Sequence, residues 1–200
     1  MSLIKTEQSN RQRFAEFVSN AFHPFAVSVV TLILVIYLDG STWWDAIKWT
    51  AVGFGIVILP LTLFLAVNVR RGHYSDWSIS IREQRHTIYF LAGVCFVVLI
   101  QVFIWGGAPA IALACLYAAL VTVVVSAMIN RFATKISLHS VSMAGCTAAL
   151  SWVSLPLGIV FAVATLLVSW SRIYLNQHTF AQILIGWIVP ASSVAIIFRL

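Results

Sequence analysis

Charged residues are scarce in this chain. Asp, Glu, Lys and Arg make up 9% of its 200 residues, whereas hydrophobic residues make up 61% and the mean hydropathy is +0.97. A soluble domain carries about 25% charged residues, so this composition excludes an ordinary soluble fold. The sequence therefore predicts an all-α protein that crosses a membrane several times.

Acidic residues and cysteines are also few, with six Asp and Glu and three Cys in all. The sequence has no HExxH motif, no paired cysteines and no acidic cluster, which are patterns that hold metal ions. Cys95, Cys115 and Cys146 fall inside apolar runs without CxxC spacing. We expect them to pack as small apolar side chains, with no disulfide, metal or cofactor.

Positive charge is spread thinly along the sequence. Twelve Lys and Arg residues give a formal net charge of +6, but they are scattered between apolar runs. A nucleic-acid-binding protein would collect them on one soluble face. The charge therefore indicates membrane topology and anion binding, and no nucleic-acid partner is expected.

Apolar runs that approach the length of a membrane span recur along the chain. A helix needs about 20 apolar residues to cross the hydrocarbon core. The runs 138–154 and 156–171 are short, so these two either cross the membrane or tilt together as a partly inserted hairpin. We predict one bundle of six to seven transmembrane helices over residues 22–200. The runs lie near 22–38, 46–69, 87–105, 109–129, 138–154, 156–171 and 179–198.

Residues 1–21 form a predicted amphipathic segment at the membrane surface, because basic residues accompany Phe14, Phe17 and Val18 at helical spacing. A basic start before an apolar run also resembles a signal peptide. The run that ends at Leu38 is followed by Asp-Gly-Ser-Thr-Trp-Trp, without a small-x-small cleavage pattern. This favours an uncleaved first span.

Polar residues return in three clusters, 70–86, 130–140 and 171–182. Two apolar runs separate each cluster from the next, and a pair of crossings returns the chain to the side where it started. The three clusters and the N-terminus should therefore lie on one face of the membrane. Small residues in 142–151 would let helices approach closely and bring His139 beside His178.

These clusters hold side chains that could bind and attack a phosphate. Guanidinium groups take phosphate oxygens in pairs and stabilise the charge that develops as a bond breaks. One neutral imidazole can attack phosphorus while a second, protonated imidazole gives a proton to the departing oxygen. We expect His23 and His73 to be interfacial and outside this site. The candidates are Arg82, Arg85, Lys135, Ser137, His139, Arg172 and His178.

Three segments resemble the motifs of the type 2 phosphatidic acid phosphatase (PAP2) superfamily. Residues 171–178 resemble SRxxxxxH, and residues 136–139, Ile-Ser-Leu-His, resemble PSGH. Residues 82–86, Arg-Glu-Gln-Arg-His, stand in the place of KxxxxxxRP. Order and approximate spacing agree from about 70 to 190, which is nearly the whole membrane core.

The resemblance implies a membrane phosphatase that hydrolyses a lipid phosphate or diphosphate without a metal. It implies that His178 is the nucleophile, through a phosphohistidine, that His139 is the general acid, and that Arg172 is catalytic. The substrate could be a phosphatidate, a phosphatidylglycerophosphate or a polyprenyl phosphate or diphosphate. The phosphate-binding residues expected from the motifs and their surroundings are Arg82, Arg85, Lys135, Ser137 and Ser171.

The sequence departs from the motifs at several positions. Ser78 replaces the family lysine, so Arg82 or Lys135 would supply that charge. Gln182 stands four residues after His178, where the family usually has aspartate. Its carbonyl can accept the ring N–H on a shared helix face and fix the tautomer, but it cannot stabilise an imidazolium as a carboxylate would. We expect lower activity or a shifted pH profile.

Two other functions and the orientation stay open at this point. The same fold could transfer the phosphoryl group to a lipid or sugar acceptor, or Gln182 could mark a lipid-binding or scaffold protein descended from an enzyme. The positive-inside rule favours a cytoplasmic active face in the plasma (inner) membrane. The resemblance favours the outer side, where many bacterial members act. The oligomeric state is not indicated.

Overall fold

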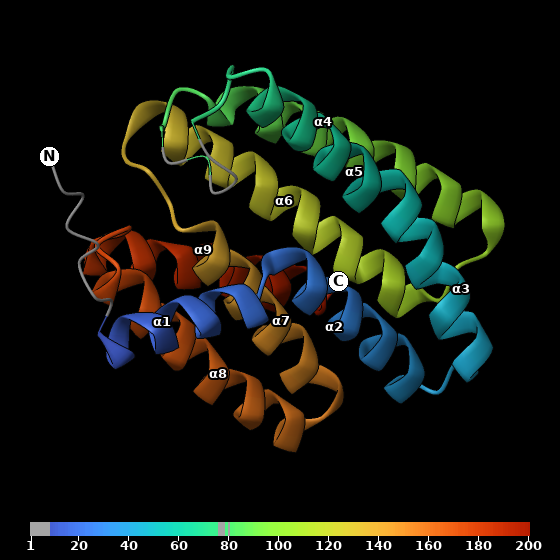
Figure 1. The fold of residues 1–200 in the computed structure, drawn as a ribbon. Coiled ribbons are helices and arrows are strands. Elements are labelled where there is room, and N and C mark those ends of the chain that lie inside the picture. The colour runs from blue at the N-terminus through green and yellow to red at the C-terminus, as the bar shows by residue number, and fades with distance from the viewer. Residues whose placement is uncertain (1–8, 76–78, 80) are drawn as a thin grey trace, which may run out of the picture.

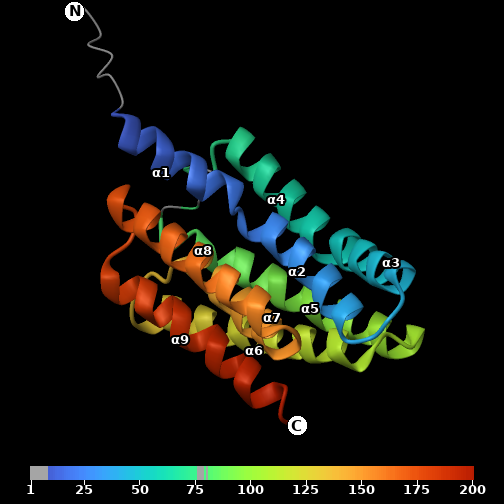
Figure 2. The same ribbon diagram turned by 90° about the horizontal axis from the view of Figure 1, so that it is seen from below.

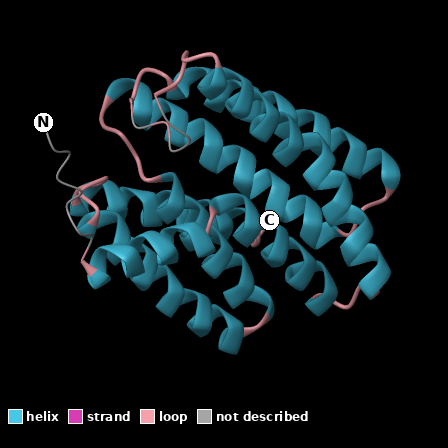
Figure 3. Ribbon diagram, viewed as in Figure 1, coloured by secondary structure: helices cyan, strands magenta, loops and turns pink. Residues whose placement is uncertain are grey.

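The computed structural model describes residues 9–75, 79 and 81–200, and these contain helices but no strand (Figure 3). This agrees with the predicted all-α class. In chain order the elements are α1 Asn10–Ala21, α2 Pro24–Leu38, α3 Trp43–Gly53, the π-helical segment η1 Phe54–Ile58, α4 Leu59–Arg70, α5 Arg85–Gly106, α6 Ala110–Phe132, α7 Leu138–Val153, α8 Leu155–Tyr174 and α9 Phe180–Ile197.

The helices form two groups with α2 between them. Figure 1 shows α3 to α6 on one side and α1, α7, α8 and α9 on the other. Helix α7 packs against α8 and α9, α5 packs against α6, and α1 packs against α8. Contacts of α2 with α7, α3 and α6, and of α6 with α9, join the two groups.

Among the described residues, five helical segments are long and apolar enough to cross a membrane, and six are if the bent pair α1–α2 is one span. The protein is therefore built as a multi-pass membrane protein. The five segments are Trp43–Arg70, Arg85–Gly106, Ala110–Phe132, Leu155–Tyr174 and Phe180–Ile197.

The expectation of a seventh full span is wrong for the described part of the chain. The run 138–154 forms α7, which has 16 residues and is not among the helices long enough to cross. The run 156–171 belongs to α8, which has 20 residues and does qualify. The chain turns between them at Ser154, which is extended, and Pro156 lies in the first turn of α8, where its missing N–H costs no helical bond.

A tight turn joins α5 to α6. Gly107 adopts the left-handed conformation, with φ 68°, directly after α5, and Pro109 precedes α6. Without a Cβ, glycine takes this conformation at little cost. Helices α5 and α6 therefore form a hairpin.

The N-terminal span is bent. Helices α1 and α2 meet at an angle of 48° at Phe22–His23. His23 is the N-cap of α2, where its Nδ1 accepts from the Phe25 N–H at 3.4 Å. Figure 2 shows α1 leading into α2 along one side of the molecule. Residues 1–8, which include Lys5 of the predicted amphipathic segment, lie outside the described residues.

Close helix packing brings the start of α9 to the start of α7. A Cβ placed on Gly186 would lie 3.0 Å from the Cβ of Ser140 and 3.3 Å from the carbonyl oxygen of Ser137. Because glycine presents no side chain, the two backbones approach closely. This contact places the segment before α9, with His178, next to the N-terminus of α7.

Candidate active site

The three polar clusters meet at one end of the bundle. Arg85, which starts α5, donates from Nη1 to the carbonyl of Ile136, just before α7, at 2.7 Å. Gln182, in the first turn of α9, donates from Nε2 to the Thr134 hydroxyl at 3.2 Å. Side chains of all three clusters are thus tied together around the 133–137 segment that links α6 to α7.

His178 lies between α8 and α9 and is held by the expected partner. Its Nδ1 is 3.1 Å from Oε1 of Gln182, and the same oxygen accepts the Thr179 N–H at 3.3 Å. Because a backbone N–H can only donate, the shared atom is an acceptor, so Nδ1 of His178 carries the proton. The neutral ring therefore has an unprotonated Nε2, which is the nucleophilic atom of an imidazole.

The surroundings of His178 keep its ring neutral. Its side chain is 7% exposed. Burial and, after it, the positive charges of Lys135, Arg172 and Arg85 lower the pKa of His178 to about 3, against the hydrogen bond to Gln182, which raises it. An anion among the three cations would offset their effect. The ring is therefore neutral at neutral pH.

Arg172 acts electrostatically on both predicted catalytic histidines. It is buried near the end of α8, and its charge acts on the titration of both His178 and His139. Its Nη1 donates to the Ser19 hydroxyl at 2.7 Å. Its carbonyl accepts the N–H groups of Gln177 and His178, which fixes the turn that carries the nucleophile.

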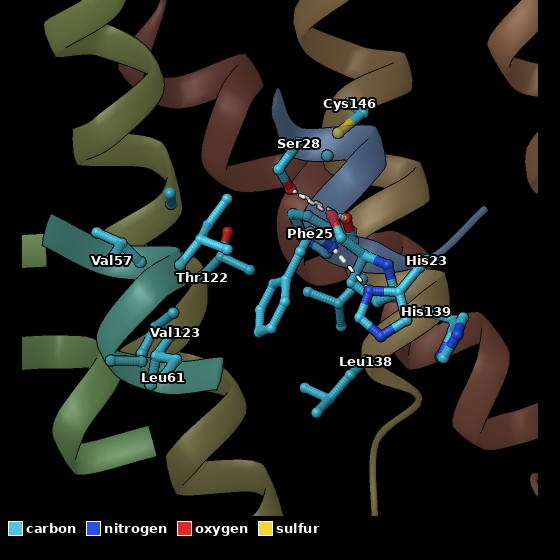
Figure 4. Close-up of a pocket in the computed structure, with 18 of the residues that line it drawn as sticks. His23, Phe25, Ser28, Val57, Leu61, Thr122, Val123, Leu138, His139 and Cys146 are labelled. Atoms are coloured by element: carbon cyan, nitrogen blue, oxygen red, sulfur yellow. Dashed lines mark hydrogen bonds between the residues drawn. The ribbon is translucent and has the colours of Figure 1, made fainter. Parts of the chain in front are cut away.

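His139 is the second residue of α7 and has a neighbour that the sequence did not indicate. The rings of His139 and His23 lie edge to face, with centroids 6.0 Å apart. Figure 4 shows the two rings beside each other on one side of a pocket, with Val57 and Leu61 on the opposite side. The backbone of Ser19 accepts a hydrogen bond from the His139 ring. His139 therefore sits where α1, α2 and α7 meet.

Arg85 is 3% exposed, and its guanidinium donates to two backbone carbonyls. Besides Ile136, it donates from Nε to the carbonyl of Ile79 at 2.8 Å. Its charge acts on His178, and its side chain lines the cavity described below, as that of Arg172 does.

Arg82 and Lys135, the two candidates to supply the charge of the family lysine, differ in their contacts. Arg82 donates to the carbonyls of Asn130 and Arg131, at the end of α6, so its guanidinium is engaged with backbone. Lys135 exerts the largest electrostatic effect on His178. Arg82 therefore fixes the loop before α5, and a phosphate contact from Lys135 stays a prediction. Ser78 lies outside the described residues.

Ser137 and Ser171 are fully buried, and their hydroxyls are occupied by nearby groups. Ser137 is the N-cap of α7 and accepts from the N–H and the hydroxyl of Ser140. Ser171 donates to the Val168 carbonyl at 2.7 Å. Both residues hold the helix ends that carry His139 and Arg172, and their phosphate contact stays a prediction.

A cavity of about 610 Å³ opens beside these groups and continues into the apolar interior. Arg85, His139, Arg172, Glu16 and His23 are among its lining residues, whereas His178 and Lys135 are not. Its remaining wall is mostly apolar and comes from α2, from α3 to α6, and from α7 and α9. Among these wall residues are Leu32, Phe54, Val57, Leu61, Ala92, Phe96, Leu99 and Leu116. The shape suits an amphiphile with one anionic end.

Sequence reasoning missed the contribution of α1 to this cavity. Glu16, Ser19, Asn20 and His23 all line it. Their spacing of three, one and three residues is that of one helix face, which was the available signal. The resemblance drew attention to three later motifs, and none of them includes residues before 70.

Among residues 9–75, 79 and 81–200, no three His, Cys, Asp or Glu side chains gather closely enough to hold a metal ion. Comparisons with protein-family models, with curated proteins and with solved structures found no match to this chain.

Proposed function

We propose that this protein is a membrane phosphatase that hydrolyses the phosphate ester or diphosphate of a lipid without a metal ion. The observation that carries the proposal is the hydrogen bond between His178 and Gln182, which places the proton on Nδ1 and leaves Nε2 unprotonated, together with the positive charges of Lys135, Arg172 and Arg85 that act on the ring. A neutral imidazole surrounded by cations combines a nucleophile with an anion site. The motif resemblance points to the same chemistry.

In the first half of the reaction, Nε2 of His178 attacks phosphorus and the bond to the leaving oxygen breaks. Burial and the charge of Arg172 lower the pKa of His139 to about 3, and the negative charge of the bound phosphate would offset this effect. In its imidazolium form His139 gives a proton to the leaving oxygen, so the lipid departs as an alcohol or as a lipid monophosphate. The ring of His178 then carries the phosphoryl group on Nε2 and keeps its proton on Nδ1, which donates a hydrogen bond to Gln182. Arg85, Arg172 and Lys135 stabilise the charge on the phosphoryl oxygens.

In the second half, water attacks the phosphorus of the phosphohistidine. His139, now neutral, removes one proton from that water, and the bond from phosphorus to Nε2 breaks. Inorganic phosphate leaves, and His178 returns with its free Nε2. The proton that His139 gave in the first half is thereby restored, so the cycle closes.

The cavity supports a lipid as the substrate. Arg85, Arg172 and His139 line it, and most of its other lining side chains are apolar residues of the bundle. Water-soluble phosphate esters would leave this apolar wall without a partner, whereas a hydrocarbon chain would bury area at roughly 25 cal/mol per Å². The headgroup and the first part of the tail would therefore bind together.

The test is phosphate release by detergent-solubilised protein in EDTA, with a phosphatidate, a phosphatidylglycerophosphate and a polyprenyl diphosphate as substrates and no acceptor added. We expect release from at least one of them, and loss of at least 100-fold in His178→Ala. The matched control is His73→Ala, because His73 is exposed and bonded to Asn68. Release only after Mg²⁺ is restored, or equal activity in both variants, would refute the proposal.

A further inference from the structure

Ser19 makes two contacts with the candidate catalytic groups although it lies outside every motif. Its hydroxyl accepts from Arg172 Nη1 at 2.7 Å, across 153 residues of sequence. Its backbone accepts from the His139 ring. Ser19 is 5% exposed and lies in the last turn of α1, where carbonyl oxygens are left without helical N–H partners.

We infer that Ser19 is a positioning residue, which sets the direction of both the Arg172 guanidinium and the His139 ring. The inference rests on the proposed function, since it assigns a role in the same site. It also means that α1, the helix before the first long apolar run, is part of the active site.

A serine suits the contact with Arg172 for an electrostatic reason. A carboxylate in the same place would hold the guanidinium but would also cancel much of its charge, which the anionic headgroup requires. A hydroxyl accepts one N–H, orients the planar group and leaves its positive charge intact.

The contact with His139 fixes which ring nitrogen faces the substrate. One ring nitrogen donates to the Ser19 carbonyl, so the other is the one available at the cavity that His139 lines. The edge of the His23 ring beside it narrows the space in which His139 could rotate. When the His139 ring is protonated, its second proton is therefore on the nitrogen that faces the cavity.

The test uses Ser19→Ala in the 200-residue chain, with Ser193→Ala as the matched control. Ser193 is 5% exposed, as Ser19 is, but it lies in α9 outside the cavity lining and donates to the Val189 carbonyl at 2.9 Å. We expect Ser19→Ala to lower kcat by about 10- to 100-fold with less than a threefold change in KM, because a displaced group mainly affects the transition state. The thermal midpoint should stay near that of the wild type. An unchanged kcat overturns the inference.

A second measurement does not depend on catalysis. Binding of inorganic phosphate, followed by titration calorimetry in EDTA, should weaken about tenfold in Ser19→Ala. In an Arg172→Ala background the same change should have no further effect, because its partner is gone. If the wild type binds phosphate in this Ser19-dependent way but hydrolyses nothing, the proposed function fails and the inference stands. Equal phosphate affinity with and without the Ser19 hydroxyl overturns the inference.

Discussion

Arg85 and Ile136 are joined by a buried hydrogen bond of 2.7 Å between Nη1 and a carbonyl oxygen, across 51 residues of sequence. The same guanidinium also holds the carbonyl of Ile79. The Arg85 side chain therefore fixes the start of α5 against the loop before it, at Ile79, and against the segment before α7, at Ile136. It does so beside His178, the candidate nucleophile.

Arg85→Lys should destabilise the protein by about 1–3 kcal/mol, because a lysine cannot serve both buried carbonyls and leaves one of them unpaired. For a chain of this length the thermal midpoint in detergent should fall by roughly 2–10 °C. The matched control is Arg70→Lys, since Arg70 is exposed at the end of α4. A midpoint for Arg85→Lys equal to that of the control would contradict this reading.

Gln182→Glu should move the acidic limb of the kcat/KM profile to higher pH. In the wild type, burial and Lys135 lower the pKa of His178 to about 3, so the ring is neutral throughout the neutral range. A carboxylate at Oε1 would favour the imidazolium and raise that pKa by about 1–3 units. Attack needs the neutral ring, so activity is then lost as pH falls through the higher value.

The control for this experiment is Gln84→Glu. Gln84 carries the same amide, but it bonds to Ser75 and to the carbonyl of His73. Its profile should match that of the wild type. If the acidic limb of Gln182→Glu also stays in place, the hydrogen bond between Gln182 and His178 does not govern the pKa of the nucleophile.

Gly158→Ala should destabilise the hairpin of α7 and α8. Its Cβ would meet Ser151 at 2.7 Å from Cα and 2.8 Å from Cβ, so backbone would have to move. Overpacking of this kind costs about 1–3 kcal/mol. Gly93→Ala, which has nothing within 4 Å of the new Cβ, should leave the thermal midpoint unchanged or raise it slightly. Equal midpoints for the two variants would contradict the packing described for α7 and α8.

Hydropathy was sufficient to predict most of the bundle, because a span buries its backbone bonds within one helix and needs little from its neighbours. Hydropathy did not predict the length of α7 or the bend between α1 and α2. α7 is apolar enough but has only 16 residues, and α1 joins α2 through a bend at Phe22–His23. Both features depend on packing against α8, which sequence periodicity does not report.

The candidate site was predictable where residues share a helix and not where they meet across helices. The contact of His178 with Gln182 follows from their spacing of four residues. The role of Ser19 depends on α1 crossing the end of α8, and a single serine carries no pattern. Likewise, Arg82 and Lys135 looked equivalent in sequence until the structure placed Arg82 on the end of α6.

The orientation of the site can be tested with Ser75→Cys. Ser75 lies between α4 and α5, on the face that carries the three polar clusters. With Cys95, Cys115 and Cys146 replaced by alanine, a membrane-impermeant maleimide should label the new cysteine only after the cells are permeabilised, as the positive-inside rule requires. Ready labelling of intact cells would place the site on the outer side.

The most direct test of the account is to trap the phosphoenzyme. The protein is mixed in EDTA with a substrate labelled in its terminal phosphate, quenched in alkali within milliseconds, and the protein-bound label is measured. We predict label that is stable in alkali and lost in mild acid, as expected of a phosphohistidine, in the wild type and none in His178→Ala. No such label during measurable turnover, or the same amount in His178→Ala, would contradict the central claim that His178 is the nucleophile.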